Sequence, residues 1–522
     1  MDTKTIYRIV TILGLTAVIA FAFGGIGTSV SAKRPPVTEV YPTGVYPDDL
    51  IAIQNAVDAN PGGKVVLKAT TEEGVPCAFN LGDDTTGRGI VQITNAVTIE
   101  GKKGHPHNVT LPNGKILDKV KLPVVYGGGA KGLTWPPVGP IPAEEVVGSF
   151  HIAAPDDFVT VKDTLFYGSG FTAVSIAACN GVMISGNEVF NPVPKPIFPG
   201  WEPFYWGITV SEGWSLLGIP GCALSGTITI EKNNIQLEKI DDRWGIGISV
   251  MELQSENVDF RIIGNRLQNP CQWGRGILME GFPNSTALIK ENTVSGPPDQ
   301  AVTIGAGATT GIPAGTFELI NNRLDGGGVC IRIWRVKDST IRGNTCNGIG
   351  QTPETEAKAI DIDQGCENIV VEKNKITIEG VEGCKVFGIH IWGEGCHNNT
   401  IKQNTIKGSV EVGIELSGAH HDNMFIANDL KHLEVTEAHV YLDSDTYNNV
   451  FVKNKPKVKD MIIIDEGVNN RIDDKGKAAP ALLKEFAFAA LSAYPQPCNP
   501  DTWIPYTLAK DVEVAIAIYS SS

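Results

Sequence analysis

Apolar and polar residues alternate in short stretches along most of the chain. In residues 359–376, AIDIDQGCENIVVEKNKI, apolar Ile360 and Ile362 alternate with Asp361 and Asp363, and a second apolar cluster follows. Strict alternation is typical of a half-buried β-strand, whereas an amphipathic helix would repeat every 3.6 residues. The pattern predicts strands separated by tight turns. It leaves open whether the two aspartates are solvated or take part in chemistry.

One pattern, apolar-x-x-Asn-x-apolar, returns through most of the chain, with a mean step of about 30 residues. Its asparagines are Asn187, Asn233, Asn265, Asn292, Asn322, Asn344, Asn374, Asn404, Asn428 and Asn454. A second strand, which begins with a small residue and an apolar one, precedes most of them, as in GISV at 247 and GIHI at 388. Such units predict a solenoid of stacked parallel strands. The stacked asparagines should form a structural ladder of amide hydrogen bonds.

The paired pattern G-I-x-I followed by N-N-x-I-x-x-N-x-I, as in GIHIWGEGCHNNTIKQNTI (388–406), resembles the right-handed parallel β-helix repeat of the pectin-lyase-like superfamily. The resemblance covers about residues 65–470 and implies an all-β, right-handed parallel β-helix. Repeats with the Asn-Asn turn are similar to those of NosD-type periplasmic proteins and of carbohydrate-binding or sugar-hydrolase β-helices. The superfamily contains lyases, hydrolases, epimerases and binding proteins, so the resemblance assigns no reaction.

The two ends of the chain lack the repeat. Residues 1–32 have basic residues ahead of an apolar run and end in Val-Ser-Ala, which predicts a signal peptide and a secreted, periplasmic or cell-surface protein. Residues 33–64 are expected to form an N-terminal cap, with a short amphipathic helix and the first strand in 48–67, capped by Asp48 or Asp49. Residues 471–522 are expected to form a partly helical C-terminal capping tail, with a helix in 480–494. Residues 100–150 are expected to be long loops.

The composition narrows the classes of partner that the protein could bind. The 522-residue chain has a formal net charge of −15, which argues against nucleic acid and anionic membranes, because both need a basic face. We expect no membrane association after signal cleavage, a monomer, and few or no disulfides among the ten cysteines. The charge also weakens the case for an anionic substrate, unless arginines such as Arg332 and Arg335 or a bound cation reverse the local field.

Because stacked strands lie in register about 4.8 Å apart, matching positions form columns on the outer face. The first column is Ser175, Thr209, Ser249, Leu278, Thr303, Arg332, Asp361, His390, Glu415 and Tyr441. The second column is Ala177, Ser211, Met251, Glu280, Gly305, Trp334, Asp363, Trp392, Ser417 and Asp443. Charged and aromatic residues gather in the later part of both columns.

This clustering predicts a polysaccharide or cell-envelope glycan in a groove, because a flat indole packs against a sugar ring while charged groups bind its hydroxyls. The residues expected to bind the glycan are Arg332, Trp334, Trp392, Tyr441 and Asp443, with Trp206, Trp244 and Trp273 as walls of the upper end. The alternative is a face of ordinary solvated cross-strand pairs. In that case the protein is a non-catalytic surface, scaffold or carbohydrate-binding protein.

Four residues of these columns are the candidate catalytic groups: Asp361, Asp363, His390 and Glu415. In a glycoside hydrolase two carboxyl groups would act as acid and as nucleophile or base. In a lyase or epimerase, His390 or Tyr441 would remove a proton next to a uronate carboxylate while Arg332 neutralises the developing charge. The sequence permits both reactions.

Known catalytic signatures are absent: we find neither the paired-Asp and Gly-His-Gly signature of polygalacturonases nor the arginine pattern of classical pectate lyases. Copper handling, which NosD likeness suggests as a weaker alternative, would need clustered His, Met or Cys. His420 and His421 have no evident third ligand, and Cys179, Cys366 and Cys396 are predicted to be buried inward thiols. We expect no metal site and no cofactor, although a divalent cation such as calcium is compatible with the carboxylates.

Overall fold

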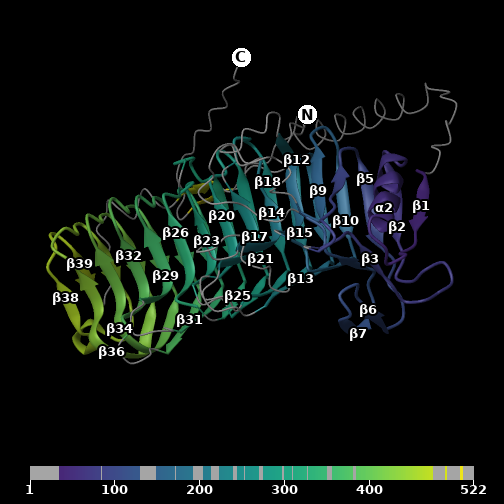
Figure 1. Ribbon diagram of the computed structural model, residues 1–522. Helices are drawn as coiled ribbons and strands as arrows, with labels where there is room; N and C mark the ends of the chain where they lie inside the picture. The colour runs from purple at the N-terminus through teal and green to yellow at the C-terminus, as the bar shows by residue number, and fades with distance from the viewer. Residues whose placement is uncertain are drawn as a thin grey trace, which may run out of the picture.

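Short parallel strands stacked along one axis form almost the whole molecule (Figure 1). The computed structural model describes residues 35–83, 85–129, 148–170, 172–191, 204–212, 223–238, 244–251, 253–269, 274–296, 299–308, 310–325, 327–349, 356–379, 384–473, 488–490 and 506–508. The predicted signal peptide lies outside these residues. In the described ranges, 37 strands form one continuous sheet, and every pairing within it is parallel where its register is given. The predicted all-β parallel fold is confirmed.

Each coil of the solenoid contributes strands to three faces, which we call A, B and C. Face A consists of β4 (Val91–Ile93), β9 (Phe150–Ala154), the first half of β12 (Thr172–Ser185), β14 (Phe204–Val210), β17 (Trp244–Met251), β20 (Arg275–Glu280), β23 (Gln300–Gly305), β26 (Val329–Trp334), β29 (Ala357–Asp363), β32 (Val386–Trp392), the second halves of β34 (Thr405–Ser417) and β36 (Asp429–Leu442), and β38 (Ile463–Asp465).

Face B follows in each coil. It consists of β1 (Val37–Val40), β2 (Gly63–Leu67), β5 (Val97–Gly101), β10 (Val159–Lys162), the second half of β12, β15 (Leu224–Glu231), β18 (Asp259–Ile263), β21 (Thr286–Lys290), β24 (Thr316–Ile320), β27 (Thr340–Arg342), β30 (Val370–Glu372), β33 (Thr400–Lys402), β35 (Met424–Ile426), β37 (Val450–Val452) and β39 (Arg471–Asp473). In the segment predicted as the cap, β1 already pairs in parallel with β2.

Face C completes each coil. It consists of β3 (Ala78–Asn80), β8 (Val124–Tyr126), β11 (Leu165–Tyr167), β13 (Glu188–Asn191), β16 (Asn234–Leu237), β19 (Arg266–Gln268), β22 (Thr293–Ser295), β25 (Arg323–Asp325), β28 (Thr345–Ile349), β31 (Lys375–Glu379) and the first halves of β34 and β36. The inward side chains of all three faces form one continuous apolar core, which runs the length of the solenoid.

The predicted asparagine ladder forms between faces B and C. The Asn374 side-chain amide donates to Asn404 Oδ1 and to the Ile341 carbonyl, both at 3.0 Å. Its Oδ1 accepts from the backbone and side-chain nitrogens of Asn344, at 2.8 and 3.0 Å. The same contacts link the ladder from Asn187 to Asn454. These buried polar atoms are satisfied by one another, which confirms the structural role of the ladder.

The structure adds a second ladder, which the repeat did not reveal. It runs through Asn399, Asn423, Asn449 and Asn470, one at each turn between faces A and B. The small residue that opens each face A strand also has a physical reason, because a Cβ on Gly388 would lie 2.4 Å from the Gly413 carbonyl of the next coil. Adjacent coils therefore approach too closely there for a large side chain.

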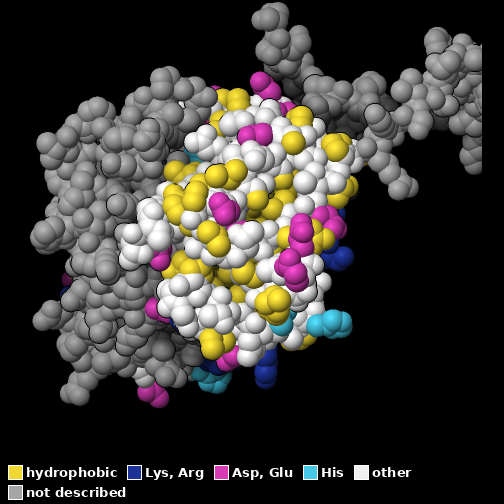
Figure 2. Space-filling model, turned by 45° about the vertical axis from the view of Figure 1, so that its right-hand side comes forward, with side chains coloured by type: hydrophobic (Ala, Val, Ile, Leu, Met, Phe, Trp, Pro, Cys, Tyr) yellow, Lys and Arg dark blue, Asp and Glu magenta, His cyan; other side chains and the backbone are white. Residues whose placement is uncertain are grey.

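The N-terminal end is closed by α2 (Asp48–Asp58), as predicted. The predicted N-cap residue of this helix is wrong, since Pro47 occupies the N-cap position and neither Asp48 nor Asp49 caps the helix with its side chain. Asp49 instead accepts backbone N–H groups of Thr43, Gly44 and Asn80, at 2.7, 2.9 and 2.8 Å, so it fastens the helix to the first coils. Figure 2 turns this end forward and shows apolar side chains interspersed with carboxylates.

Residues 100–150 are not only loops. An antiparallel hairpin, β6 (His107–Thr110) and β7 (Ile116–Val120), projects from the first coils, and β8 belongs to face C. The hairpin buries Val109, Leu111 and Val120 against Tyr126 and Tyr167. Its turn contains Asn113-Gly114, a strong hairpin signal that explains the difference.

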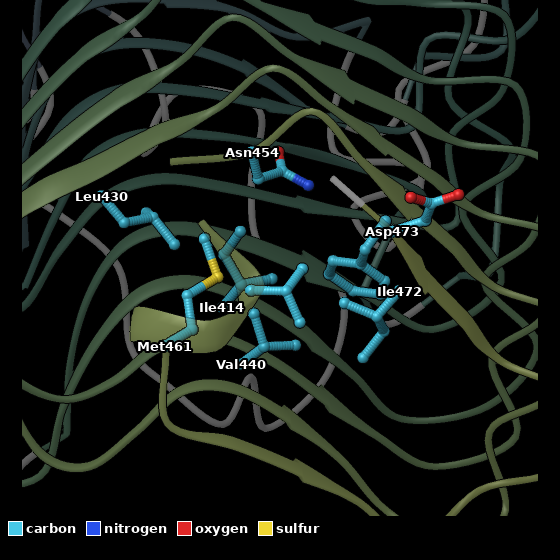
Figure 3. Close-up of a pocket in the computed structure, with 9 residues that line it drawn as sticks. Ile414, Leu430, Val440, Asn454, Met461, Ile472 and Asp473 are labelled. Carbon is cyan, nitrogen blue, oxygen red and sulfur yellow. The ribbon is translucent and has the colours of Figure 1, made fainter. Parts of the chain in front are cut away.

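At the C-terminal end the core opens into an apolar hollow (Figure 3). Side chains from β34, β36 and β39 line it together with Met461, which follows the short 3-10 helix η3 (Val458–Asp460). In the tail, β40 (Phe488–Ala490) and β41 (Tyr506–Leu508) pair antiparallel. The helix predicted over 480–494 is therefore wrong at 488–490, and the rest of that segment lies outside the described residues.

Two further observations complete the fold. Cys179, Cys366 and Cys396 are free thiols and are buried inward, as predicted. No helix in those ranges is long and apolar enough to cross a membrane.

Candidate functional site

Strand pairing places the predicted outer columns on face A. In the first column the partners run from Ser175 to Thr209, Ser249, Leu278, Thr303, Arg332, Asp361, His390, Glu415 and Tyr441 in unbroken register. In the second column the register runs from Met251 to Ser417. The vertical arrangement predicted from the repeat is confirmed over these coils.

An ion-pair network joins three neighbouring coils at the centre of face A. His390 Nδ1 lies 2.9 Å from Asp361 Oδ1. Arg332 Nη2 donates to Asp363 Oδ2 at 3.0 Å, and its Nε lies 3.6 Å from Asp361 Oδ2. Lys358 Nζ lies 3.7 Å from Asp361 Oδ1. We call these five residues the face A cluster.

The cluster is more buried than alternation predicts. Asp361, Asp363 and His390 are 2%, 1% and 4% exposed, whereas the sequence places them on an open, water-facing sheet. The reason is that neighbouring side chains fold over them. Arg332 and Lys358 reach across to the carboxylates, and the Phe387 ring lies 4.9 Å from the imidazole. Both aspartates are therefore unlike solvated strand residues.

Burial and neighbouring charges shift the pKa values of the three carboxyl groups in different directions. Burial alone would raise the pKa of Asp361, but the His390 hydrogen bond and the charges of Lys358, His390 and Arg332 outweigh it, so this pKa is lowered. Burial raises the pKa of Asp363, and the neighbouring Asp361 charge adds to the rise despite the Arg332 hydrogen bond. Burial also raises the pKa of Glu415. Groups with opposite shifts on one face are the arrangement that acid–base chemistry needs.

The Asp361 contact fixes the histidine tautomer. Because the lowered pKa keeps Asp361 ionised, its carboxylate can only accept a hydrogen bond. The Nδ1 nitrogen of His390 must therefore donate, and in the neutral imidazole the lone pair lies on Nε2. Nε2 is the atom of this pair that can take up a proton.

The network is incomplete in the part of the chain that the structure describes. Asp363 Oδ1 is buried and has no hydrogen-bond partner, and the same holds for Arg332 Nε. Native proteins leave few such groups unpaired, because each costs free energy. One acceptor and one donor of this buried ion pair therefore have no hydrogen-bond partner among the described residues.

Two tryptophans border the cluster. Trp334 lies against Gly305, where an added Cβ would be 2.3 Å from the indole, and Arg332 lies 5.8 Å from the ring centre. Trp392 is 43% exposed, and Lys358 lies 5.7 Å from its ring centre. Trp392 therefore presents an aromatic surface beside the cluster.

The remaining predicted residues are placed less centrally. Glu415 and Tyr441 follow His390 on the next two coils and are half-buried. Asp443 accepts the backbone N–H groups of Gly418 and Asp445, at 2.6 and 3.0 Å, so both its oxygens stabilise a turn.

The predicted upper wall does not form from Trp206. This residue is 3% exposed and four strands away from β26, so it offers no open surface to a glycan. The side chain of Trp244 and the whole of Trp273 lie outside the described residues.

Sequence reasoning missed a third column on face A. Its members are the residues that directly precede the small residue of each face A strand. It contains Arg275, Gln300, Val329, Lys358 and Phe387 in register. Arg275 contacts Glu280 and Asp299 at 3.3 and 3.6 Å. The signal was present, since each of these residues stands at a fixed distance before an aligned position, but strict alternation does not extend across a bend.

Among the described residues, no group of three His, Cys, Asp or Glu side chains has the arrangement of a metal site. His420 and His421 lie in different environments. His420 is buried, whereas the ring of His421 stacks between the rings of His397 and Tyr447.

Comparison with known proteins agrees with this architecture. Residues 254–430 match the family model for the right handed beta helix region. The protein is a right-handed parallel β-helix. The matched range includes all five residues of the face A cluster, and the β-helix repeat predicted from the Asn-turn pattern is confirmed. No curated protein matches the sequence.

Solved β-helix structures resemble the chain only distantly. The A-module of the mannuronan C-5 epimerase AlgE6 of Azotobacter vinelandii is 12% identical, with a TM-score of 0.47, over 83% of this chain and 96% of that one. The AlgE4 A-module of the same organism is 13% identical, with a TM-score of 0.46, over 76% and 95%. PfbA, a surface adhesin of Streptococcus pneumoniae, is 13% identical, with a TM-score of 0.35, over 84% and 92%. Likenesses of this size carry no argument about substrate.

Proposed function

We propose that this β-helix protein is exported, binds a polysaccharide across face A and processes it at the face A cluster. The observation that carries the proposal is the buried Asp361–His390 pair beside the exposed ring of Trp392. An oriented imidazole supplies a proton acceptor, and an exposed indole suits the face of a sugar ring. The apolar run in residues 1–32 supports export.

The chemistry would use His390 Nε2 as the base. Asp361 holds the ring in its tautomer and stabilises the imidazolium that forms. Glu415, on the next coil, would supply a proton as general acid, since its raised pKa keeps a larger share of it protonated. A hydrolase, a lyase and an epimerase each use such an acid and base.

A non-catalytic carbohydrate-binding or surface protein is the second candidate. It is favoured by the burial of Asp361 and Asp363, because a buried ion-pair network can also serve only to hold three coils together. In this case Trp392 would contribute binding without turnover.

Product formation separates the two. The full chain would be incubated with neutral and acidic polysaccharides, and the products assayed for new reducing ends, unsaturated sugars and changed C5 configuration. We expect one of these products from the wild type and a loss of 10²–10⁴-fold in rate in His390→Gln, which keeps a donor toward Asp361. His432→Gln, an exposed histidine of β36, is the matched control.

Binding gives a second measure. Retention on the same polysaccharides would be compared for wild type and for Trp334→Ala/Trp392→Ala. Retention without any product would favour the non-catalytic candidate. Equal retention by both proteins would show that the tryptophans of face A do not bind the polysaccharide, and face A would then be the site of neither function.

A further inference from the structure

The cations of face A already have anionic partners. Arg275 contacts Glu280 and Asp299, and Arg332 contacts Asp361 and Asp363. Lys358 contacts Asp361 and also Glu356, at 3.7 and 3.1 Å. Three positive charges thus lie within ion-pair distance of five carboxylates. The residues that would neutralise an anionic sugar are occupied before any ligand arrives.

The next coils add negative charge. This charge comes from Glu411 and Glu437, which add to burial in raising the pKa of Glu415, against the opposing effects of His390 and the exposed Lys385. The whole chain carries a formal charge of −15. Like charges in a partly buried site repel one another strongly, because the effective dielectric constant is well below that of water. A uronate carboxylate would meet this repulsion along the cluster.

The unpaired atoms of the Arg332–Asp363 pair favour a hydroxyl group. Asp363 Oδ1 needs a donor and Arg332 Nε needs an acceptor. A sugar hydroxyl can donate and accept at once, whereas a carboxylate only accepts and would repel Asp363. The cluster therefore matches the chemistry of an uncharged sugar better than that of a uronic acid.

We infer that the face A site takes an uncharged glycan and that the reaction, if the proposed function holds, is hydrolysis. In that step the oxygen of water bonds to the anomeric carbon and the glycosidic carbon–oxygen bond breaks. Water gives its proton to His390 Nε2, and the leaving oxygen takes a proton from Glu415. Elimination and C5 epimerisation are disfavoured, because both require a uronate carboxylate to be held and neutralised.

Affinity electrophoresis of the full chain tests this inference. Gels would contain a neutral glucan, mannan or xylan, or else polygalacturonate or alginate. We expect retardation at least tenfold stronger in one neutral polymer than in either polyuronate, and unchanged between about 0.05 and 0.5 M NaCl, since neutral ligands release no counter-ions. Wild-type binding to a polyuronate, weakening with salt, would overturn the inference.

Two variants sharpen the test. Glu280→Gln/Asp299→Asn removes the two negative charges that contact Arg275, and we expect it to gain several-fold polyuronate binding that salt abolishes. Arg335→Ala removes an exposed cation that is in no ion pair of the described residues, and we expect no effect on neutral binding. Loss of wild-type polyuronate binding in Arg335→Ala would place an anionic ligand at that turn and would contradict the inference.

Failure of the two proposals can be told apart. Binding of polyuronates but of no neutral polymer would overturn the neutral-ligand inference and leave glycan binding intact. Absence of retardation in every polymer by a protein with wild-type circular dichroism would overturn the proposed function together with this inference.

Discussion

The asparagine ladder that contains Asn374 and the face A cluster are both buried polar networks, and they differ in how completely they are paired. In the asparagine ladder, uncharged amides repeat from coil to coil, and Asn374 uses both its oxygen and its nitrogen on neighbours. In the face A cluster, five charged or titratable side chains meet in three coils only, and Asp363 Oδ1 and Arg332 Nε make no hydrogen bond in the described part of the chain. The first network is complete without a ligand, whereas the second is not.

The comparison teaches how burial is to be interpreted on a β-helix. Burial alone does not separate structure from function, since Asn374 and Asp363 are equally inaccessible at 1% exposed. What separates them is the satisfaction of hydrogen bonds, since Asn374 uses both polar atoms of its side chain on neighbours whereas Asp363 Oδ1 has no hydrogen-bond partner. A neutral, repeated, satisfied column supports the fold, and a charged, local, unsatisfied one indicates a ligand site.

The largest effect should come from breaking the charged network at its centre. Asp361→Asn removes the partner of His390, Arg332 and Lys358, and we expect turnover to fall 10²–10⁴-fold and the free energy of unfolding to fall by about 3 kcal/mol. Because the folded pKa of Asp361 is lowered, its contribution to stability is present above the ordinary value of about 3.9 and is lost as pH falls through the folded value. Urea unfolding from pH 7 to pH 3 measures this.

The matched control is Asp325→Asn, which breaks the more exposed Arg323–Asp325 pair on face C. It should change the unfolding free energy by under about 1 kcal/mol. An Asp361→Asn protein with wild-type turnover would show that the cluster is not a catalytic site.

The complete network should be sensitive in stability alone. Asn374→Ala deprives the two Asn344 donors and the Ile341 carbonyl of partners, so we expect the free energy of unfolding to fall by about 2–3 kcal/mol. Urea unfolding with Asn347→Ala, an outward amide of β28, as control measures it. Loss of glycan binding at temperatures where Asn374→Ala remains folded would contradict the separation of the two networks.

The ladder could be predicted from the sequence, and the cluster only in part. A repeat of asparagines at one position fixes both the coil and the register, so Asp361 and His390 could be placed on adjacent strands before any coordinates. Lys358 could not, because it lies beyond the bend before Ala359, where alternation no longer tells which side chains share a face. Burial of the aspartates was also beyond the pattern, since it depends on long side chains that fold back over the sheet.

The exposed ring of Trp392, which lies beside the face A cluster, offers a smaller test. Trp392→Ala removes an indole that is 43% exposed, so stability should change by no more than about 0.5 kcal/mol. If the ring stacks on a sugar, affinity should fall roughly tenfold, as expected for loss of one aromatic contact. Titration with the retained polysaccharide measures this, with Tyr447→Ala, a similarly exposed ring at a turn, as control. Equal losses in both variants would argue against a specific stacking position.

The smallest expected effect sharpens the electrostatic side of the comparison. Burial raises the pKa of Glu415 above its ordinary value, so its ionised form is less favourable in the folded protein than in the unfolded one. The folded state is therefore penalised as pH rises from about 4.3 through the raised folded value, and the penalty persists above it. Glu415→Gln should raise the unfolding free energy at pH 7 by less than about 1 kcal/mol, and the gain should vanish near pH 3.5. Urea unfolding at both pH values measures it, with Glu372→Gln, a carboxylate of β30 paired with Lys402, as the control that should lose rather than gain stability. A Glu415→Gln protein that is less stable than wild type at pH 7 would mean that this carboxylate belongs with the satisfied, structural groups, and it would no longer be a candidate general acid.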